Sequence, residues 1–114
     1  MSDTDKYTFK CLCGKCGFTA CGAPVMVPLC HCKTCRVYGG GPAYVAAFMP
    51  DKVTHLEAEG DVIKYESAPN KFRYTCKTCG TWIYNTLPNG INALPLAALE
   101  VESGPKLGSK GERL

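Results

Sequence analysis

The sequence predicts a mainly β protein built from small antiparallel sheets. Apolar and polar residues alternate over short segments that are rich in aromatic and β-branched side chains, a pattern typical of half-buried strands. Glycine and proline lie between these segments, where turns are expected. No stretch keeps a helical period over about ten residues. We therefore expect at most one short helical turn, within residues 34–39.

The first half of the chain contains three clear strand candidates. Residues 7–11 alternate around aromatic side chains, and residues 18–21 follow a glycine-containing turn. Residues 43–49 form a continuous apolar segment that Pro50 ends, as expected for a buried strand. The later strand candidates are residues 53–57, 62–66, 72–76, 82–84 and 91–99. Short connections between these strands predict antiparallel neighbours.

The length and composition predict a single domain. A chain of 114 residues with 46% hydrophobic residues can form one modest core. We expect a frayed N-terminus over residues 1–6, a folded domain over residues 7–100 and a mobile tail over residues 101–114. No apolar run approaches the ~20 residues of a membrane span, and the start of the sequence is polar. A cytoplasmic protein with no membrane partner is expected.

Nine cysteines are the most unusual feature of the composition, and they cluster. Cys30, Cys32 and Cys35 form a C-x-C-x-x-C motif, Cys11 and Cys13 form a pair before it, and a C-x-x-C pair follows. An odd count and the polar, acidic start of the sequence argue against a disulfide framework. Thiolates are the ligands that zinc, copper(I) and iron–sulfur clusters select. Four ligands would close a structural zinc site, whereas three would leave a position for substrate.

The central motif can bring three sulfurs to one ion. In an extended segment, residues two apart point the same way, so Cys30 and Cys32 can face a metal while His31 faces away. The two-residue spacing from Cys32 to Cys35 is that of a zinc knuckle. Basic side chains lie beside these thiols and can lower their pKa values or bind substrate carboxylates. They are Lys33 and Arg36, with Arg73 as a more distant candidate.

The spacing alone leaves several ligand sets open. One set is Cys11, Cys13, Cys76 and Cys79. A second set exchanges Cys11 for Cys16, which gives two C-x-x-C-G knuckles as in a zinc ribbon or a rubredoxin iron site. In a third scheme, Cys16 or Cys21 completes the central site and closes it to substrate.

The net charge does not predict a nucleic-acid partner. The formal charge is +3 with cysteines counted as neutral. If seven cysteines bind two Zn²⁺ ions as thiolates, the thiolates contribute seven negative charges and the ions four positive charges. The net charge of the protein then changes by −3. The loaded protein would then be about neutral, without the basic excess typical of nucleic-acid binding.

Three motifs in this order resemble the glutathione-dependent formaldehyde-activating enzyme family, which also includes centromere protein V. The motifs are residues 11–14, 30–36 and 76–81, and the resemblance covers residues 7–97. It implies a β-tent fold, a set of antiparallel sheets clamped by zinc. Two departures from the family pattern are the additional thiols Cys16 and Cys21, and the lack of an apolar closing segment after Leu99.

The resemblance also implies the roles of the cysteines. The structural zinc would take Cys11, Cys13, Cys76 and Cys79. A second, catalytic zinc would take Cys30, Cys32 and Cys35, with water or a substrate thiol as its fourth ligand. The implied activity is that of a carbon–sulfur lyase acting on S-hydroxymethylglutathione, the adduct of glutathione and formaldehyde. Two other classes compete with this reading: a non-catalytic zinc-binding interaction module and an iron protein for electron transfer.

Overall fold

A computed structural model describes residues 5–39 and 43–104 as ten strands, one α-helix and three short 3₁₀ helices. The strands are β1 (Lys6–Lys10), β2 (Gly17–Cys21), β3 (Leu29–Cys30), β4 (Ala43–Phe48), β5 (Val53–His55), β6 (Val62–Ala68), β7 (Lys71–Cys76), β8 (Trp82–Thr86), β9 (Asn92–Pro95) and β10 (Glu100–Ser103). The helix is α1 (Lys33–Gly39), and the 3₁₀ helices are η1 (Pro50–Lys52), η2 (Glu59–Asp61) and η3 (Leu96–Ala98). The prediction of a mainly β protein is confirmed. None of the described helices is long and apolar enough to cross a membrane.

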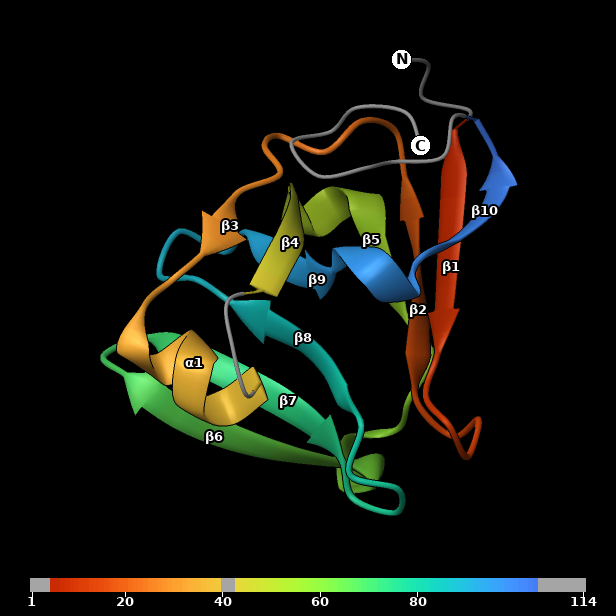
Figure 1. Cartoon of the computed structure of the whole chain (residues 1–114). Helices are drawn as coiled ribbons and strands as arrows, with labels where there is room; N and C mark the ends of the chain where they lie inside the picture. Colours follow the sequence, from red (N-terminus) through yellow and green to blue (C-terminus); the bar gives the residue numbers. More distant parts are fainter. Residues whose placement is uncertain (1–4, 40–42, 105–114) are drawn as a thin grey trace.

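The strands form two antiparallel sheets. One has four strands in the order β10-β1-β2-β5, and the other has six in the order β3-β4-β9-β8-β7-β6. Figure 1 shows the β1–β2 turn and the β7–β8 turn at the same end of the molecule, although they come from different sheets. It also shows α1 lying over the part of the six-stranded sheet formed by β6 and β7.

Aromatic side chains fill the space between the sheets. Phe9 of β1 stacks on Phe18 of β2 at 5.1 Å between ring centroids, and Tyr7 meets Phe48 of β4 at 6.3 Å. Phe18 and Phe48 are fully buried. Burying each such side chain stabilises the fold by about 1.5–3 kcal/mol. This core fixes the two sheets relative to one another, and so fixes the turns that carry the cysteines.

A second, more polar contact joins the two sheets at His55 of β5. Its ring stacks on Tyr84 of β8 at 4.0 Å, and Tyr84 stacks on Tyr74 of β7 at 4.2 Å. Its Nε2 donates a hydrogen bond of 2.9 Å to Asn92 Oδ1 on β9. His55 therefore packs between the two sheets and helps to join them.

Gly17 is the tightest point of the β1–β2 hairpin. A Cβ atom at this position would overlap the carbonyl oxygen of Phe9. We expect Gly17→Ala to lower the free energy of unfolding by about 1–3 kcal/mol, because the paired strand must move away. Gly60→Ala is the matched control, since a Cβ atom added to Gly60 would meet no other atom within 4 Å. Equal urea midpoints for the two variants would contradict the prediction.

The structure corrects the predicted ends of the domain. Asp5 is buried and its carbonyl accepts a hydrogen bond of 2.9 Å from Gly22 N–H, and Lys6 begins β1, where a frayed segment was expected. Residues 101–103, assigned to the tail, belong to β10 and pair with β1. Pairing with an edge strand, rather than burial, orders this segment. Residues 105–114 of the expected tail lie outside the described residues.

Two further expectations are corrected. The single helical turn is a seven-residue helix, α1, which begins one residue before the predicted range. The predicted strand over residues 91–99 is interrupted, because η3 follows β9 directly after Pro95. Proline has no backbone N–H to continue the ladder.

Candidate metal centres

Four cysteines from the two sheets meet at one end of the molecule. Cys11 and Cys13 lie in the β1–β2 turn, Cys76 ends β7 and Cys79 lies in the β7–β8 turn. Their Sγ atoms all lie within 4.8 Å of one another. The Sγ–Sγ distances are 3.5 Å for Cys11–Cys13 and 3.6 Å for Cys13–Cys76. Zinc–sulfur bonds of ~2.3 Å in a tetrahedron would place sulfurs about 3.8 Å apart, so this donor set fits zinc.

Two similar turns build this cluster. Gly14 and Gly80 have φ values of 82° and 77°, a conformation that glycine adopts without strain. Their N–H groups donate to the carbonyls of Cys11 and Cys76 at 3.0 and 2.9 Å, which closes each turn. The N–H of Cys79 also donates to Cys76 Sγ at 3.5 Å. Backbone donors of this kind favour the thiolate form that metals bind.

The two additional thiols lie outside both clusters. Cys16 is buried, and its thiol donates to the Asp61 carbonyl at 3.5 Å. Burial raises the pKa of Cys16 to about 12. Cys21 is the last residue of β2, and its neighbour in register is Lys6. The structure therefore brings together neither the set that contains Cys16 nor a central cluster closed by Cys16 or Cys21.

Three cysteines form the second cluster, hereafter the triad: Cys30, Cys32 and Cys35. Cys30 ends β3, Cys32 precedes α1 and Cys35 lies in the first turn of α1. The Sγ–Sγ distances are 3.4 Å for Cys30–Cys32 and 2.7 Å for Cys30–Cys35. The 2.7 Å pair is closer than two ligands of one zinc, so an ion would spread it by about 1 Å. With three soft donors and no fourth cysteine among the described residues, the triad suits an open zinc site.

The triad cysteines differ in their surroundings. The N–H of Cys35 donates to Cys32 Sγ at 3.3 Å and is the main cause that lowers the pKa of Cys32 to about 7. Burial raises the pKa of Cys35 to about 12. A metal must displace the proton from each thiol that it binds. Acid is therefore expected to weaken metal binding at the triad.

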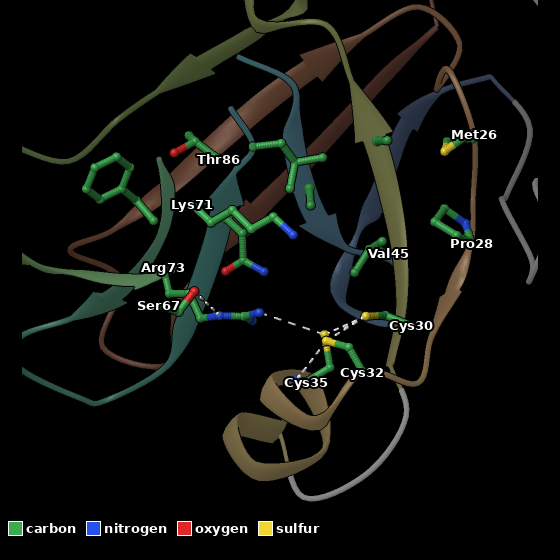
Figure 2. Close-up of a pocket in the computed structure, with 15 residues that line it drawn as sticks. Met26, Pro28, Cys30, Cys32, Cys35, Val45, Ser67, Lys71, Arg73 and Thr86 are labelled. Carbon is green, nitrogen blue, oxygen red and sulfur yellow. Dashed lines mark hydrogen bonds between the residues drawn. The ribbon is translucent and has the colours of Figure 1, made fainter. Parts of the chain in front are cut away.

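A pocket of about 260 Å³ opens directly onto the triad. Figure 2 shows the three sulfurs together at one end of it. The apolar part of its wall consists of Met26, Pro28, Val45, Ala47, Phe72, Leu87 and Ala93. The polar part consists of Ser67, Lys71, Arg73, Asn85 and Thr86. Among the described residues, the wall contains two cations and no carboxylate, so the pocket favours an anionic ligand with apolar parts.

Arg73 lines this pocket beside the triad. It is 9% exposed, and its Nη2 lies 3.9 Å from Cys35 Sγ. Its Nε donates to Ser67 Oγ at 3.2 Å, and its guanidinium lies 5.2 Å from the centre of the Tyr38 ring. In Figure 2 the guanidinium points from β7 toward the sulfurs. Arg73, a possible partner for substrate carboxylates in the sequence analysis, thus contacts a cysteine.

The two predicted substrate-binding cations lie elsewhere. Lys33 and Arg36 are exposed on α1, and neither lines the pocket at the triad. Arg36 Nε donates to the His31 carbonyl at 3.1 Å, and Lys33 lines an adjacent surface pocket beside α1 that shares Ser67 and Arg73 with the triad pocket. Lys71, which lies in none of the cysteine motifs, does line the triad pocket. Lys71 could have been identified from its position two residues before Arg73, because residues two apart in a strand point to the same face of the sheet.

Comparison with known proteins decides the family. Residues 6–105 match the sequence profile described as glutathione-dependent formaldehyde-activating enzyme. The chain belongs to this family. The resemblance predicted from the three cysteine motifs is therefore confirmed, and the family match includes the strand β10.

Two further proteins are similar to this family member. A Schizosaccharomyces pombe protein named as an uncharacterized lyase is 34% identical over 87 residues, which cover 76% of this chain and 62% of that protein. The chain thus spans less than two thirds of the length of that relative. A crystal structure of a Rhodobacter sphaeroides protein has a TM-score of 0.65 at 18% identity, over 86% of this chain and 91% of the other. That structure shares the fold.

Proposed function

We propose that the protein is a zinc-dependent carbon–sulfur lyase that acts on a thiol adduct such as S-hydroxymethylglutathione. Membership of the family and the name of the S. pombe relative support a lyase. The observation that carries the proposal is the triad, a three-sulfur cluster that opens onto an apolar pocket with two cations. A purely structural site would have no need of an incomplete ligand set beside a pocket.

The two clusters take different roles in this proposal. Cys11, Cys13, Cys76 and Cys79 hold a structural zinc that joins the two sheets. Cys30, Cys32 and Cys35 hold a catalytic zinc. When bound there, zinc supplies a site for a substrate sulfur in its thiolate form and acts as a mild Lewis acid.

The residues of the chain orient the substrate and restrict water. In the lyase direction the carbon–sulfur bond of the adduct breaks, its hydroxyl proton is lost, and the carbonyl compound leaves. The sulfur departs as a thiolate, so one proton returns when the free thiol forms. Lys71 and Asn85 line the pocket, where they can orient a carboxylate and a peptide group of the thiol. The side chains of Val45 and Phe72 in the wall are apolar and offer no hydrogen bonds to water beside the reacting sulfur.

The direct test is the interconversion of ¹³C-formaldehyde and its glutathione adduct, followed by exchange NMR. The uncatalysed reaction supplies the baseline rate. We expect the zinc-loaded protein to raise the exchange rate in proportion to its concentration, and the protein treated with a chelator to return it to the baseline. An unchanged rate with two equivalents of zinc bound would contradict the proposal and favour a non-catalytic zinc module.

Lys71→Gln tests how the pocket selects its thiol. Lys71 is exposed at the start of β7, so an ion pair with a substrate carboxylate contributes about 0.2–1 kcal/mol. We expect KM for the glutathione adduct to rise about two- to fivefold with little change in kcat. The adduct of 2-mercaptoethanol has no carboxylate and serves as the control. An equal rise in KM for both adducts would show that Lys71 does not recognise carboxylate.

A further inference from the structure

Arg73 is a buried cation that pairs with no carboxylate of the described residues. Within residues 5–39 and 43–104, no acidic side chain lies within ion-pair distance of its guanidinium. A cation in this position is costly unless a negative charge balances it. The nearest group able to carry that charge is the thiolate of Cys35, whose Sγ lies 3.9 Å from Nη2.

The charge of the triad requires such a partner. Three thiolates and one Zn²⁺ ion together carry a single negative charge, and a substrate sulfur bound as thiolate adds a second. Within the part of the chain that the structure describes, the wall of the pocket contains no Asp or Glu and one cation besides Arg73. That cation, Lys71, is exposed at the start of β7, so Arg73 is the buried charge best placed to balance the triad.

We propose that Arg73 is a positioning residue for the triad. It balances the negative charge of the three thiolates and orients Cys35 Sγ through its hydrogen bond, so that the triad retains its metal and accepts a further anionic sulfur. The acceptance of a substrate sulfur rests on the proposed lyase function, whereas the retention of metal does not. Because Arg73 is directed at the sulfurs, Lys71 is left as the partner for substrate carboxylates.

The shape of the side chain suits this role better than that of lysine. The planar guanidinium donates in two directions, from Nε to Ser67 Oγ at 3.2 Å and from Nη2 toward Cys35. The Tyr38 ring, 5.2 Å from the guanidinium carbon, covers it from the side of α1. Lysine at this position would keep the charge but could not hold both contacts. Partial function of Arg73→Lys therefore separates the charge from the geometry.

The test compares Arg73→Gln, Arg73→Lys and Lys71→Gln as zinc-loaded proteins. Zinc release to a colorimetric chelator is followed over time, and release from the triad is identified as the phase that is lost in Cys32→Ser. Residues around a metal site typically change its affinity 10–100-fold. We expect triad release to be about 10–100-fold faster in Arg73→Gln and less accelerated in Arg73→Lys. Release from the four-cysteine site should not change in either variant.

Lys71→Gln is the matched control, because it removes the same charge from the same pocket without touching a cysteine. Its triad release should stay within about twofold of the unmodified protein. Equal release rates for Arg73→Gln and Lys71→Gln would overturn the proposal. If Arg73→Gln does not fold, Arg73→Lys and Ser67→Ala decide, because both keep the positive charge and disturb only its orientation. Unchanged release in both would also overturn the proposal.

Cobalt substitution gives a readout that does not depend on turnover. The thiolate-to-cobalt absorption of the triad should shift in Arg73→Gln and stay unchanged in Lys71→Gln. The steady-state constants then separate the two proposals. Arg73→Gln should raise KM for the glutathione and the 2-mercaptoethanol adducts alike, because both present a sulfur. Suppose that Arg73→Gln loses triad zinc faster but the unmodified protein does not accelerate adduct exchange. This result would refute the proposed lyase activity and leave the positioning role of Arg73 in place.

Discussion

Cys76→Ser is expected to abolish cooperative folding at 25 °C. Cys76 is buried at the end of β7, and its Sγ lies 3.6 Å from that of Cys13. A structural zinc of this type contributes an apparent ~10–16 kcal/mol, whereas the total stability of a small domain is about 5–15 kcal/mol. Losing one of the four ligands is therefore expected to remove a contribution as large as the total free energy of unfolding. Near-UV circular dichroism and the dispersion of the amide NMR spectrum measure the outcome.

Cys21→Ser is the control for this experiment. Cys21 is a partly buried cysteine of β2 that belongs to neither cluster. We expect it to change the free energy of unfolding by about 1 kcal/mol or less. A Cys76→Ser protein with a sharp unfolding transition and the midpoint of the Cys21→Ser protein would show that the four-cysteine cluster is not needed for folding.

Cys32→Ser is expected to remove the activity and leave the fold. Cys32 is exposed between β3 and α1, so no core packing depends on its sulfur. A serine hydroxyl is a poor zinc ligand at neutral pH, and two remaining thiolates hold zinc weakly. We expect bound zinc to fall from two equivalents to one, and adduct exchange to fall to the rate in buffer. Metal analysis and exchange NMR on the same sample provide both values.

The stability of this variant must be measured alongside its activity. The free energy of unfolding should stay within about 1 kcal/mol of that of the unmodified protein, because the four-cysteine site remains intact. Full turnover with one equivalent of zinc would show that the triad is not the site of the reaction. Loss of both zinc ions would show that the two clusters are not independent.

The triad could be predicted because its signal is local, whereas the full ligand set of the four-cysteine cluster is implied only by the family resemblance. The C-x-C and C-x-x-C spacings identify the thiols that a single turn can bring together. Short alternating or continuously apolar segments locate β1, β2 and β4 to β8. The choice between Cys11 and Cys16 as partner of Cys76 is a different matter. It depends on how the β1–β2 turn is directed toward the other sheet, and spacing carries no information on that direction.

The features that the sequence does not predict depend on packing between distant segments. The contact of Arg73 with Cys35 exists only because α1 lies on β7, and the pattern of neither segment predicts this arrangement. The strand β10 resembles a tail in sequence because all four of its residues are exposed, so it has no alternation to detect. It becomes a strand by pairing with β1, and the residues of β10 alone do not indicate that this edge is available.

The positions of the cysteines along the chain determine when each cluster can form during synthesis. The sulfurs of the triad lie within six consecutive residues and can capture zinc as soon as that segment leaves the ribosome. Cys13 must instead wait for Cys76, which lies 63 residues later. At ~5–20 residues per second this delay is about 3–13 s. For that time the four-cysteine cluster lacks the two ligands supplied by β7 and the β7–β8 turn, so we expect any metal at this cluster to be acquired after the triad has formed.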